Sequence, residues 1–253
     1  MCGLYGVFCY GEPFVQKIIK PLITGLGNAA MKRGIDATGI AYVQDRFVVS
    51  QKSAIAARDF KVHLPKYTSA VMGHTRLTLQ GNASNNFNNH PFEFEFNGIS
   101  GALAHNGYIP NDKILRQERN LPDTKIETDS YVAVQLLEAE NKLDTMSIKQ
   151  MCVQLNGTYC FSILDGSNNL YLVKGNNPLY MLHHKALKLY IYASTKKVLW
   201  DGILGSELFN QHFKPHYQAF NTEFSALNEI SVLGGQIVKI NSNGFMEQEF
   251  IAA

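Results

Sequence analysis

The amino-acid sequence predicts an α+β fold in which two β-sheets stack on each other and helices pack on their outer faces. The first half of the chain combines strand-like runs with one long helical pattern over residues 14–34. From residue 158 onward, most of the chain consists of short apolar runs separated by turn residues, which is typical of antiparallel strands. With 253 residues, of which 45% are hydrophobic, the chain is long and apolar enough to bury a substantial core.

The elements of the first half follow from local patterns. Residues 4–10 are rich in apolar and aromatic side chains and predict a strand. Apolar residues then recur at helical spacing from Phe14 up to Gly34, and Pro21 either kinks this helix or marks its start. The remaining predictions are strands at 38–43, 46–52, 70–77 and 98–105, the first two as a hairpin, and an Asn-rich loop at 82–89.

The second half begins with helices and then becomes rich in strands. A helix is expected to begin near Thr128 and Asp129, either of which is available to cap its first turn, and a second, short helix covers 147–155. The later strands are expected at 158–164, 170–174, 179–183, 187–194, 236–240 and 245–250, the last two as a hairpin around the turn at 241–244.

Composition and charge exclude several classes of function. The net charge is +2 at pH 7 and the 23 Lys and Arg residues are scattered, so nucleic acid is not an expected partner. The first twenty residues lack the pattern of a signal peptide or of a membrane span, and we expect a cytoplasmic protein that does not bind membranes. His74, His90 and His105 lack carboxylate companions at ligand spacing, so we expect no metal and no cofactor.

The four cysteines fall into two groups. Cys9, Cys152 and Cys160 have apolar neighbours and are expected as free thiols in the core, since no zinc or disulfide spacing is present. Cys2 instead directly follows the initiator methionine. Once Met1 is removed, which a small second residue permits, Cys2 carries both a thiol and an α-amino group with a pKa of about 7.7 to 8.0. That amine can accept the thiol proton, so the nucleophile needs no histidine as its base.

Several short motifs follow this cysteine in a fixed order. They are 1–6 (MCGLYG), 33–39 (RGIDATG), 73–76 (GHTR), 89–91 (NHP), 105–107 (HNG) and 127–129 (ETD). In this order they resemble the class II glutamine amidotransferases, a family of amino-terminal-nucleophile glutaminase domains. Residues 176–179, 193–195 and 234–238 also resemble later landmarks of that domain. The resemblance implies a single domain over 1–253 with the four-layer αββα sandwich of the amino-terminal-nucleophile hydrolases.

The resemblance also implies a reaction and the residues that carry it. Cys2 would attack the carboxamide of L-glutamine, release ammonia and leave a γ-glutamyl thioester for water to hydrolyse. The Asn106 side-chain amide and the Gly107 N–H would form the oxyanion hole. Arg76 would bind the substrate α-carboxylate, and Asp129 would bind its α-ammonium group. Together these groups would select a free amino acid over a protein side chain.

Three further residues are expected to support the site. Arg33 and Asp36 are expected to shape the floor under Cys2, and His90 is expected to be a packed histidine or one that orients other groups rather than a base. The main residues also have structural alternatives. Asp129 is a common helix cap, a buried arginine such as Arg76 is a common ion-pair partner, and the Asn-Gly pair at 106–107 is a turn signal.

Two features depart from the family pattern. In the sugar-phosphate synthases the arginine is followed by a bulky aromatic residue and then by Ala-Thr-His-Gly, whereas Arg76 is followed by Leu77, Thr78 and Leu79. Leu79 lacks a hydroxyl group that would contact the substrate. No acceptor domain follows the glutaminase motifs, so we expect the ammonia to pass to a separate synthetase or ligase. Homo-oligomerisation remains open at this stage.

Two other classes of function also remain open. An amino-terminal-nucleophile amidohydrolase that acts on another acyl amide would share the fold and Cys2, but it would not need Arg76 together with Asp129. A non-catalytic glutamine-binding regulatory subunit is favoured if Met1 stays on the chain, because the amine of Cys2 is then part of an amide bond.

Overall fold

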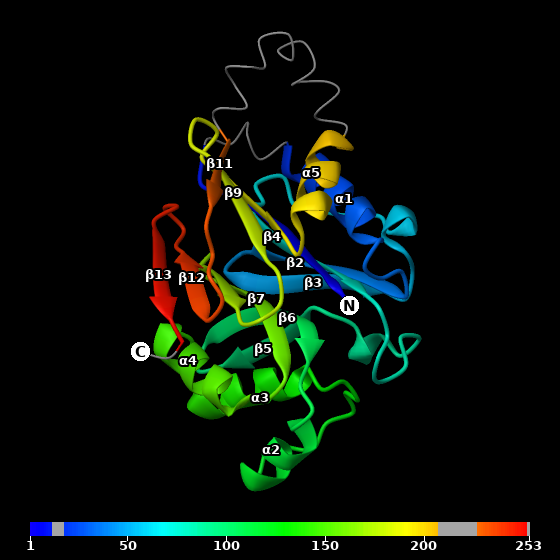
Figure 1. Cartoon of the computed structure of the whole chain (residues 1–253), viewed down its shortest axis with the longest axis vertical. Helices are drawn as coiled ribbons and strands as arrows, with labels where there is room; N and C mark the ends of the chain where they lie inside the picture. The colour runs from blue at the N-terminus through cyan, green and yellow to red at the C-terminus, as the bar shows by residue number, and fades with distance from the viewer. Residues whose placement is uncertain (12–17, 207–226, 252–253) are drawn as a thin grey trace.

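Two antiparallel sheets stacked face to face form the centre of the computed structural model, which describes residues 1–11, 18–206 and 227–251 (Figure 1). The strands of the seven-stranded sheet are, in spatial order, β11 (Leu227–Ile230), β9 (Tyr180–His184), β10 (Leu189–Ala193), β1 (Gly3–Cys9), β4 (Ala70–Arg76), β2 (Ala37–Gln44) and β3 (Phe47–Ser53). Those of the six-stranded sheet are β13 (Met246–Phe250), β12 (Gln236–Ile240), β8 (Leu170–Lys174), β7 (Thr158–Asp165), β6 (Ile99–Tyr108) and β5 (Phe92–Phe96).

Helices cover the outer faces of both sheets, which gives the four layers expected for the αββα sandwich (Figure 1). On the seven-stranded sheet lie α1 (Ile19–Ala30) and α5 (Lys196–Leu204). On the six-stranded sheet lie α3 (Tyr131–Glu140) and α4 (Thr145–Gln154), and α2 (Asp112–Glu118) lies beside α3. Two short 3₁₀ helices are η2 (Ala57–Asp59) and η3 (Asn86–Asn88). None of the helices in the described residues is long and apolar enough to cross a membrane.

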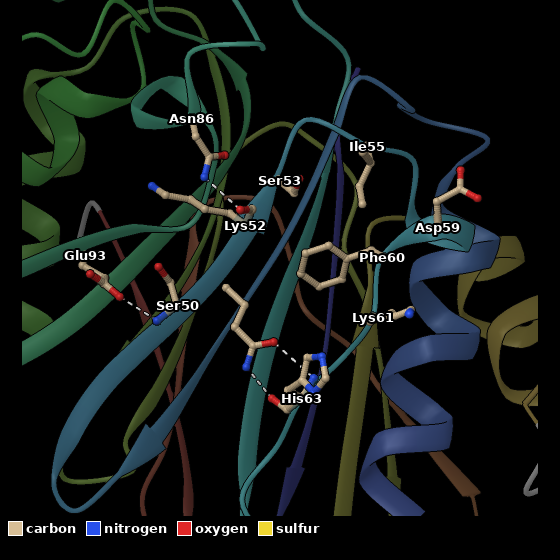
Figure 2. A pocket seen from close by; sticks show the side chains of 11 residues that line it. Ser50, Lys52, Ser53, Ile55, Asp59, Phe60, Lys61, His63, Asn86 and Glu93 are labelled. Atoms are coloured by element: carbon tan, nitrogen blue, oxygen red, sulfur yellow. Dashed lines mark hydrogen bonds between the residues drawn. The ribbon is translucent and has the colours of Figure 1, made fainter.

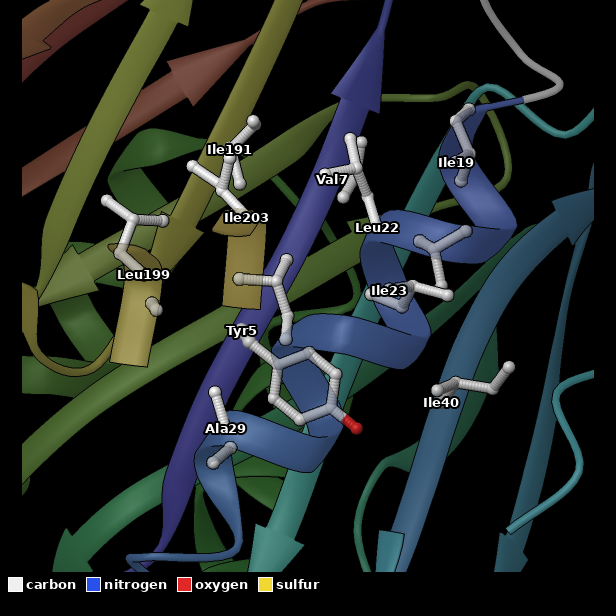
Figure 3. Close-up of a cluster of buried hydrophobic side chains, with 14 of the residues drawn as sticks. Tyr5, Val7, Ile19, Leu22, Ile23, Ala29, Ile40, Ile191, Leu199 and Ile203 are labelled. Atoms are coloured by element: carbon white, nitrogen blue, oxygen red, sulfur yellow. The ribbon is translucent and has the colours of Figure 1, made fainter. Parts of the chain in front are cut away.

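Strand β1 lies at the centre of the molecule because both of its faces are buried. All seven of its residues are buried. Tyr5 and Val7 point toward α1 and α5, where they pack against Leu22 and Ile23 (Figure 3). Leu4 and Phe8 belong instead to the apolar cluster between the two sheets. A strand that is covered on both faces needs a continuous apolar run, which is the pattern from which residues 4–10 were predicted to be a strand.

The structure confirms most of the predicted elements and shortens one of them. The helix expected over 14–34 is α1, which ends at Ala30, and Pro21 lies in its first turn, where the missing N–H has no intrahelical partner to lose. Phe14 lies outside the described residues. The prediction did not include β5, α2, α5 and β11.

The predicted cap of the helix after residue 128 is wrong. Ser130 is the residue that precedes α3; it has a helical backbone conformation, and its side chain makes no capping hydrogen bond. The Asp129 carboxylate is used elsewhere, because its Oδ2 accepts a hydrogen bond of 2.7 Å from the Ile109 N–H. This contact ties the start of α3 to the end of β6, where the predicted oxyanion residues lie.

The free edge of β3 is occupied by side chains from other elements. Val48, Ser50 and Lys52 alternate along β3, so their backbone polar groups point away from β2. The Val48 N–H donates to Ser100 Oγ at 2.9 Å and the Ser50 N–H donates to Glu93 Oε1 at 2.6 Å. The Lys52 carbonyl oxygen accepts a hydrogen bond of 2.8 Å from an amide side chain of η3. Side chains therefore form hydrogen bonds with the outward-facing backbone groups of this edge strand at three alternate residues.

Candidate active site

The backbone of Cys2 is fixed at the end of the central strand. Leu4 exchanges two hydrogen bonds with Ser194: its N–H donates to Ser194 Oγ at 2.7 Å, and its carbonyl oxygen accepts from the Ser194 N–H at 2.8 Å. On the other side, Arg33 Nε donates to the Cys2 carbonyl oxygen at 2.7 Å. Cys2 therefore lies directly on a rigid strand, although a chain terminus usually frays.

The Cys2 thiol is half-buried and faces the loop that follows β4. Its Sγ accepts a hydrogen bond of 3.4 Å from the Leu77 N–H and lies 3.5 Å from the Leu77 carbonyl oxygen, to which it can donate. Burial raises the pKa of the Cys2 thiol, against the opposite effects of the Leu77 contact, the positive chain end and Arg76. A thiol with a raised pKa needs a base to become a nucleophile. The side chain of Met1 is 57% exposed, so the chain start is accessible to processing.

The segment around Arg33 packs against the end of β4. Asp36 Oδ2 accepts a hydrogen bond of 2.7 Å from the Thr78 N–H, and the Asp36 N–H donates to the Arg76 carbonyl oxygen at 3.0 Å. A Cβ atom at Gly34 would lie 2.3 Å from the Arg76 carbonyl carbon, so only glycine fits there. Arg33 thus contacts the backbone of Cys2, and Asp36 contacts the backbone on both sides of Leu77, the residue that faces the thiol.

Arg76 is a buried cation whose guanidinium is held by neutral hydrogen-bond acceptors. It is 3% exposed, and burial lowers the pKa of its guanidinium. Its Nη1 donates to Asn89 Oδ1 at 2.6 Å, and its Nη2 donates to the carbonyl oxygens of Gln80 and Gly81 at 2.6 and 3.3 Å. Arg76 takes part in none of the ion pairs found among the described residues. Electrostatic interactions connect it to both Cys2 and Asp129.

Asp129 is a buried anion whose carboxylate is held by neutral hydrogen-bond donors. It is 7% exposed, and burial raises the pKa of its carboxyl group, although hydrogen bonds from Ile109 and Ser130 oppose the shift. It also forms no ion pair within the part of the chain that the structure describes. Its charge acts on the Cys2 thiol as well as on Arg76. Two buried opposite charges therefore act on the thiol without forming an ion pair with each other.

The predicted oxyanion residues lie near the end of β6. Asn106 is completely buried, and neither atom of its side-chain amide has a hydrogen-bond partner among the described residues. Its backbone carbonyl oxygen accepts a hydrogen bond of 2.8 Å from Asn177 Nδ2. A Cβ atom at Gly107 would lie 1.9 Å from the Thr158 carbonyl oxygen, so no side chain fits at this position. A buried amide without hydrogen-bond partners lowers the stability of the fold, and such a group is available to donate a hydrogen bond to a bound ligand.

The three histidines near the site are buried and neutral. His74 Nε2 donates to the His105 carbonyl oxygen at 3.0 Å, and His105 Nδ1 lies 2.8 Å from Ser130 Oγ. Burial lowers the pKa of His74 to about 3 and that of His105 to about 4, and it lowers the pKa of His90 well below its ordinary value. The His90 ring lies 4.2 Å from that of His74 and 4.3 Å from that of Phe92, centre to centre.

Replacing His90 by phenylalanine is expected to weaken the acid sensitivity of the fold. Both ring nitrogens of His90 lack hydrogen-bond partners in the described part of the chain, so a phenyl ring can take its place in the stack. A histidine whose pKa is lowered in the folded protein takes up a proton more readily in the unfolded state. Its contribution to stability is therefore complete above pH 6.5, the pKa of an unfolded histidine, and is lost as the pH falls below that value. His90→Phe should reduce the pH dependence of the unfolding free energy by up to about 1.4 kcal/mol per pH unit below pH 6.5.

Urea unfolding at pH 7, 6 and 5 measures this effect. An identical pH dependence in the wild type and in His90→Phe would show that His90 is already protonated in the folded protein. Ammonia release from glutamine should change little in the variant, because the His90 ring forms no hydrogen bond with any of the residues that the structure describes.

The structure brings the predicted residues of the site together. Cys2 contacts the loop after β4, Arg33 and Asp36 support it, and Arg76 and Asp129 interact with it electrostatically. Asn106 and Gly107 follow His105, whose carbonyl oxygen accepts the hydrogen bond from His74, two residues before Arg76 on β4. The roles assigned to these residues remain predictions.

Sequence reasoning missed the residues that hold these groups. Asn89 binds the guanidinium of Arg76, Asn177 holds the backbone of Asn106, and Ser194 anchors β1. All three lie within motifs that were recognised, at 89–91, 176–179 and 193–195, but a motif does not reveal contacts between residues distant in the chain.

A cavity of about 640 Å³ lies apart from this site, beside β3 and the segment that includes η2 (Figure 2). It is lined by Lys52, His63, Asn86 and Glu93, among others, and by none of the predicted site residues. Lys52 Nζ is already occupied, because it donates to the carbonyl oxygens of Asn89 and Pro91 at 2.9 and 3.1 Å. Among the described residues, no group of three or more His, Cys, Asp or Glu side chains is placed to hold a metal ion.

Comparisons with known proteins concern the sequence and the fold of this chain. A family model described as "Glutamine amidotransferase domain" matches residues 74–201, half of the chain. The chain is 32% identical over 187 residues to the glutamine–fructose-6-phosphate aminotransferase (isomerizing) of Bacillus cereus, and 30% identical over 188 residues to that of Bacillus subtilis. Each match covers 71% of this chain and 30% of the relative, so the chain spans less than a third of the length of these curated relatives.

The fold is shared with a solved structure. The glutamine phosphoribosylpyrophosphate amidotransferase of B. subtilis, complexed with ADP and GMP, superposes with a TM-score of 0.71 at 21% identity, over 99% of this chain and 49% of that one. That likeness concerns the fold, whereas the family match covers the segment that contains Arg76, Asn106 and Asp129. The chain belongs to the class II glutamine amidotransferase domain family.

Proposed function

We propose that this chain hydrolyses L-glutamine to glutamate and ammonia, with Cys2 as the nucleophile after removal of Met1. The observation that carries the proposal is that Arg76 and Asp129 are buried, have opposite charges and form no ion pair among the described residues, and that both act electrostatically on the thiol. A free α-amino acid carries the complementary carboxylate and ammonium on one carbon atom. Its binding would neutralise both buried charges at once, which an apolar acyl amide cannot do.

The proposed reaction begins at the thiol. The free α-amine of Cys2 takes the thiol proton, and the sulfur forms a bond to the carboxamide carbon of glutamine. The negative charge that develops on the carboxamide oxygen is stabilised by the Asn106 amide and the Gly107 N–H. The protonated amine then passes its proton to the leaving nitrogen, and ammonia departs as the γ-glutamyl thioester forms. Water hydrolyses the thioester, which releases glutamate and restores the thiol.

The relatives suggest how the ammonia is used. Their name, glutamine–fructose-6-phosphate aminotransferase, describes transfer of the glutamine nitrogen to a sugar phosphate. We propose that the ammonia made by this chain likewise passes to an acceptor that is bound outside the site described above, by a synthetase or ligase. The retained methionine of an unprocessed chain would block this chemistry by converting the amine into an amide.

Replacing Arg76 by lysine tests the substrate assignment. Lysine keeps the positive charge but loses the two-pronged donor that matches a carboxylate. The KM for L-glutamine should rise roughly 10- to 100-fold, the loss expected for hydrogen bonds to a charged group. The KM for 4-aminobutanamide, which has no carboxylate, should hardly change, and it should already be high in the wild type.

The measurement is ammonia release from L-glutamine, from 4-aminobutanamide and from apolar acyl amides, with protein whose mass shows that Met1 has been removed. Faster turnover of the apolar amides than of glutamine would contradict the proposal and favour an amidohydrolase of another specificity. Binding of glutamine without turnover would favour a regulatory subunit.

A further inference from the structure

We propose that Asn88 and Glu127 form a positioning pair that sets the separation between Arg76 and Asp129. The inference rests on the proposed function, in which these two groups bind the α-carboxylate and the α-ammonium of glutamine. Neither Asn88 nor Glu127 is among the groups expected to touch the substrate. Their effect would be on the geometry of the residues that do.

The pair is joined by reciprocal hydrogen bonds. Asn88 is completely buried, at the end of η3. Its Oδ1 accepts a hydrogen bond of 2.8 Å from the Glu127 N–H, and its Nδ2 donates to Glu127 Oε2 at 2.6 Å. Two bonds between the same two residues restrict both translation and rotation of one segment against the other. The second bond is short because its acceptor is charged.

On one side the pair is connected to Arg76. Glu127 accepts two more hydrogen bonds from the loop after β4, from Gln80 Nε2 at 3.0 Å and from the Asn82 N–H at 3.3 Å. The carbonyl oxygen of Gln80 and the side chain of Asn89, which follows Asn88, are the groups that hold the Arg76 guanidinium. Gln80 therefore contacts both Arg76 and Glu127. Asn89, which also holds Arg76, is the direct neighbour of Asn88.

On the other side the pair is connected to Asp129, which follows Glu127 by two residues. The loop and this segment also pack closely: a Cβ atom at Gly81 would lie 3.1 Å from Asn88 Nδ2 and 3.2 Å from the Glu127 Cβ. The left-handed backbone of Gly81, with a φ of +71°, likewise favours glycine. The 80–89 loop and the start of α3 thus form one hydrogen-bonded unit.

Arg76 and Asp129 need such a unit because opposite charges attract each other. Their interaction at reduced dielectric would draw them into a direct ion pair, which would leave no room for an amino acid between them. They do not lie within ion-pair distance of each other in this structure. The Asn88–Glu127 bonds oppose that collapse, and the Glu127 carboxylate also acts electrostatically on Arg76.

Exchange of the donor and acceptor groups tests the inference. Asn88→Asp places a second carboxylate against Glu127 and replaces an attractive contact with a repulsive one. We expect the affinity for L-glutamine to fall about tenfold, since small displacements of binding groups have large effects. Glu127→Gln added to Asn88→Asp restores a donor opposite the new carboxylate, and it should recover most of the affinity although neither original residue is present.

Affinity is measured by calorimetry with L-glutamine in a Cys2→Ala background, so that turnover does not interfere. In proteins that keep Cys2, the same variants should show a raised KM with kcat changed less than about threefold, because the thiol and the oxyanion donors are untouched. Asn85→Asp is the matched control. It introduces the same charge into the same loop, but the Asn85 side chain accepts its hydrogen bond from the Phe87 N–H and not from Glu127, so the affinity should stay unchanged.

The outcomes separate this inference from the proposed function. Equal affinity in Asn88→Asp and the parent protein would overturn the inference alone. A loss that Glu127→Gln does not repair would also overturn it, because the pair would then have no role of its own. Absence of glutamine binding in the parent protein would overturn the proposed function and the inference with it.

Discussion

Replacing Cys2 by alanine is expected to abolish glutamine hydrolysis and to leave the fold intact. Loss of a covalent nucleophile should lower kcat by at least about 10³-fold. The free energy of unfolding should change by no more than about 0.5 kcal/mol, because the thiol is half-buried and its contacts with Leu77 are long. Ammonia release and denaturant unfolding of the same preparation measure the two effects.

Mass spectrometry distinguishes Cys2 from the other thiols. Treatment with a diazo-ketone analogue of glutamine should add one adduct to the processed wild type and none to Cys2→Ala. Cys152→Ala is the matched control: it also removes one thiol, but Cys152 lies on the buried face of α4, and the variant should still form the adduct. Protein that retains Met1 and hydrolyses glutamine at the full rate would contradict the role given to the amine.

The second largest effect is expected at Asn106, where activity and stability should change in opposite directions. Asn106→Leu removes an oxyanion donor, which should lower kcat by about 10²- to 10³-fold. It also removes two buried polar atoms that have no partners among the described residues, so the free energy of unfolding should stay equal or rise by up to about 1 kcal/mol.

A paired asparagine supplies the control for this variant. Asn111 Nδ2 donates to the Gln154 carbonyl oxygen at 2.9 Å, and its Oδ1 accepts from the Asn156 N–H at 3.0 Å. Asn111→Leu should therefore destabilise the fold and leave kcat unchanged. If Asn106→Leu were the more destabilising of the two, the amide of Asn106 would have a structural role instead.

The sequence predicted the fold class because the strongest patterns belong to the most buried elements. Strand β1 is covered on both faces, so its apolar run is uninterrupted. Strand β5 was missed although its residues, FEFEF, alternate between Phe and Glu, so the signal of a half-buried strand was present in the sequence. Helix α5 begins with two lysines, and its start is marked only by Thr195, whose side chain accepts a hydrogen bond from the Val198 N–H.

For the site, the sequence predicted the residues with chemical functions but not those that hold them. Cys2 is conspicuous because of its position after Met1, and Arg76 and Asn106 lie in short motifs. The bonds between Asn88 and Glu127 join residues 39 positions apart, and no local pattern reveals such a contact. The prediction of Thr128 or Asp129 as the cap failed for the same reason, since the Asp129 carboxylate accepts from Ile109, which lies 20 residues earlier.

The side chains that close the edge of β3 also determine how the protein behaves at high concentration. An open edge strand offers a row of donors and acceptors on which another molecule can extend the sheet. Here Ser100 and Glu93 come from the opposite sheet, so stacking of the two sheets also removes that template. Resistance to intermolecular aggregation along this edge is thus acquired only when the sandwich is complete, and a partly folded chain lacks it.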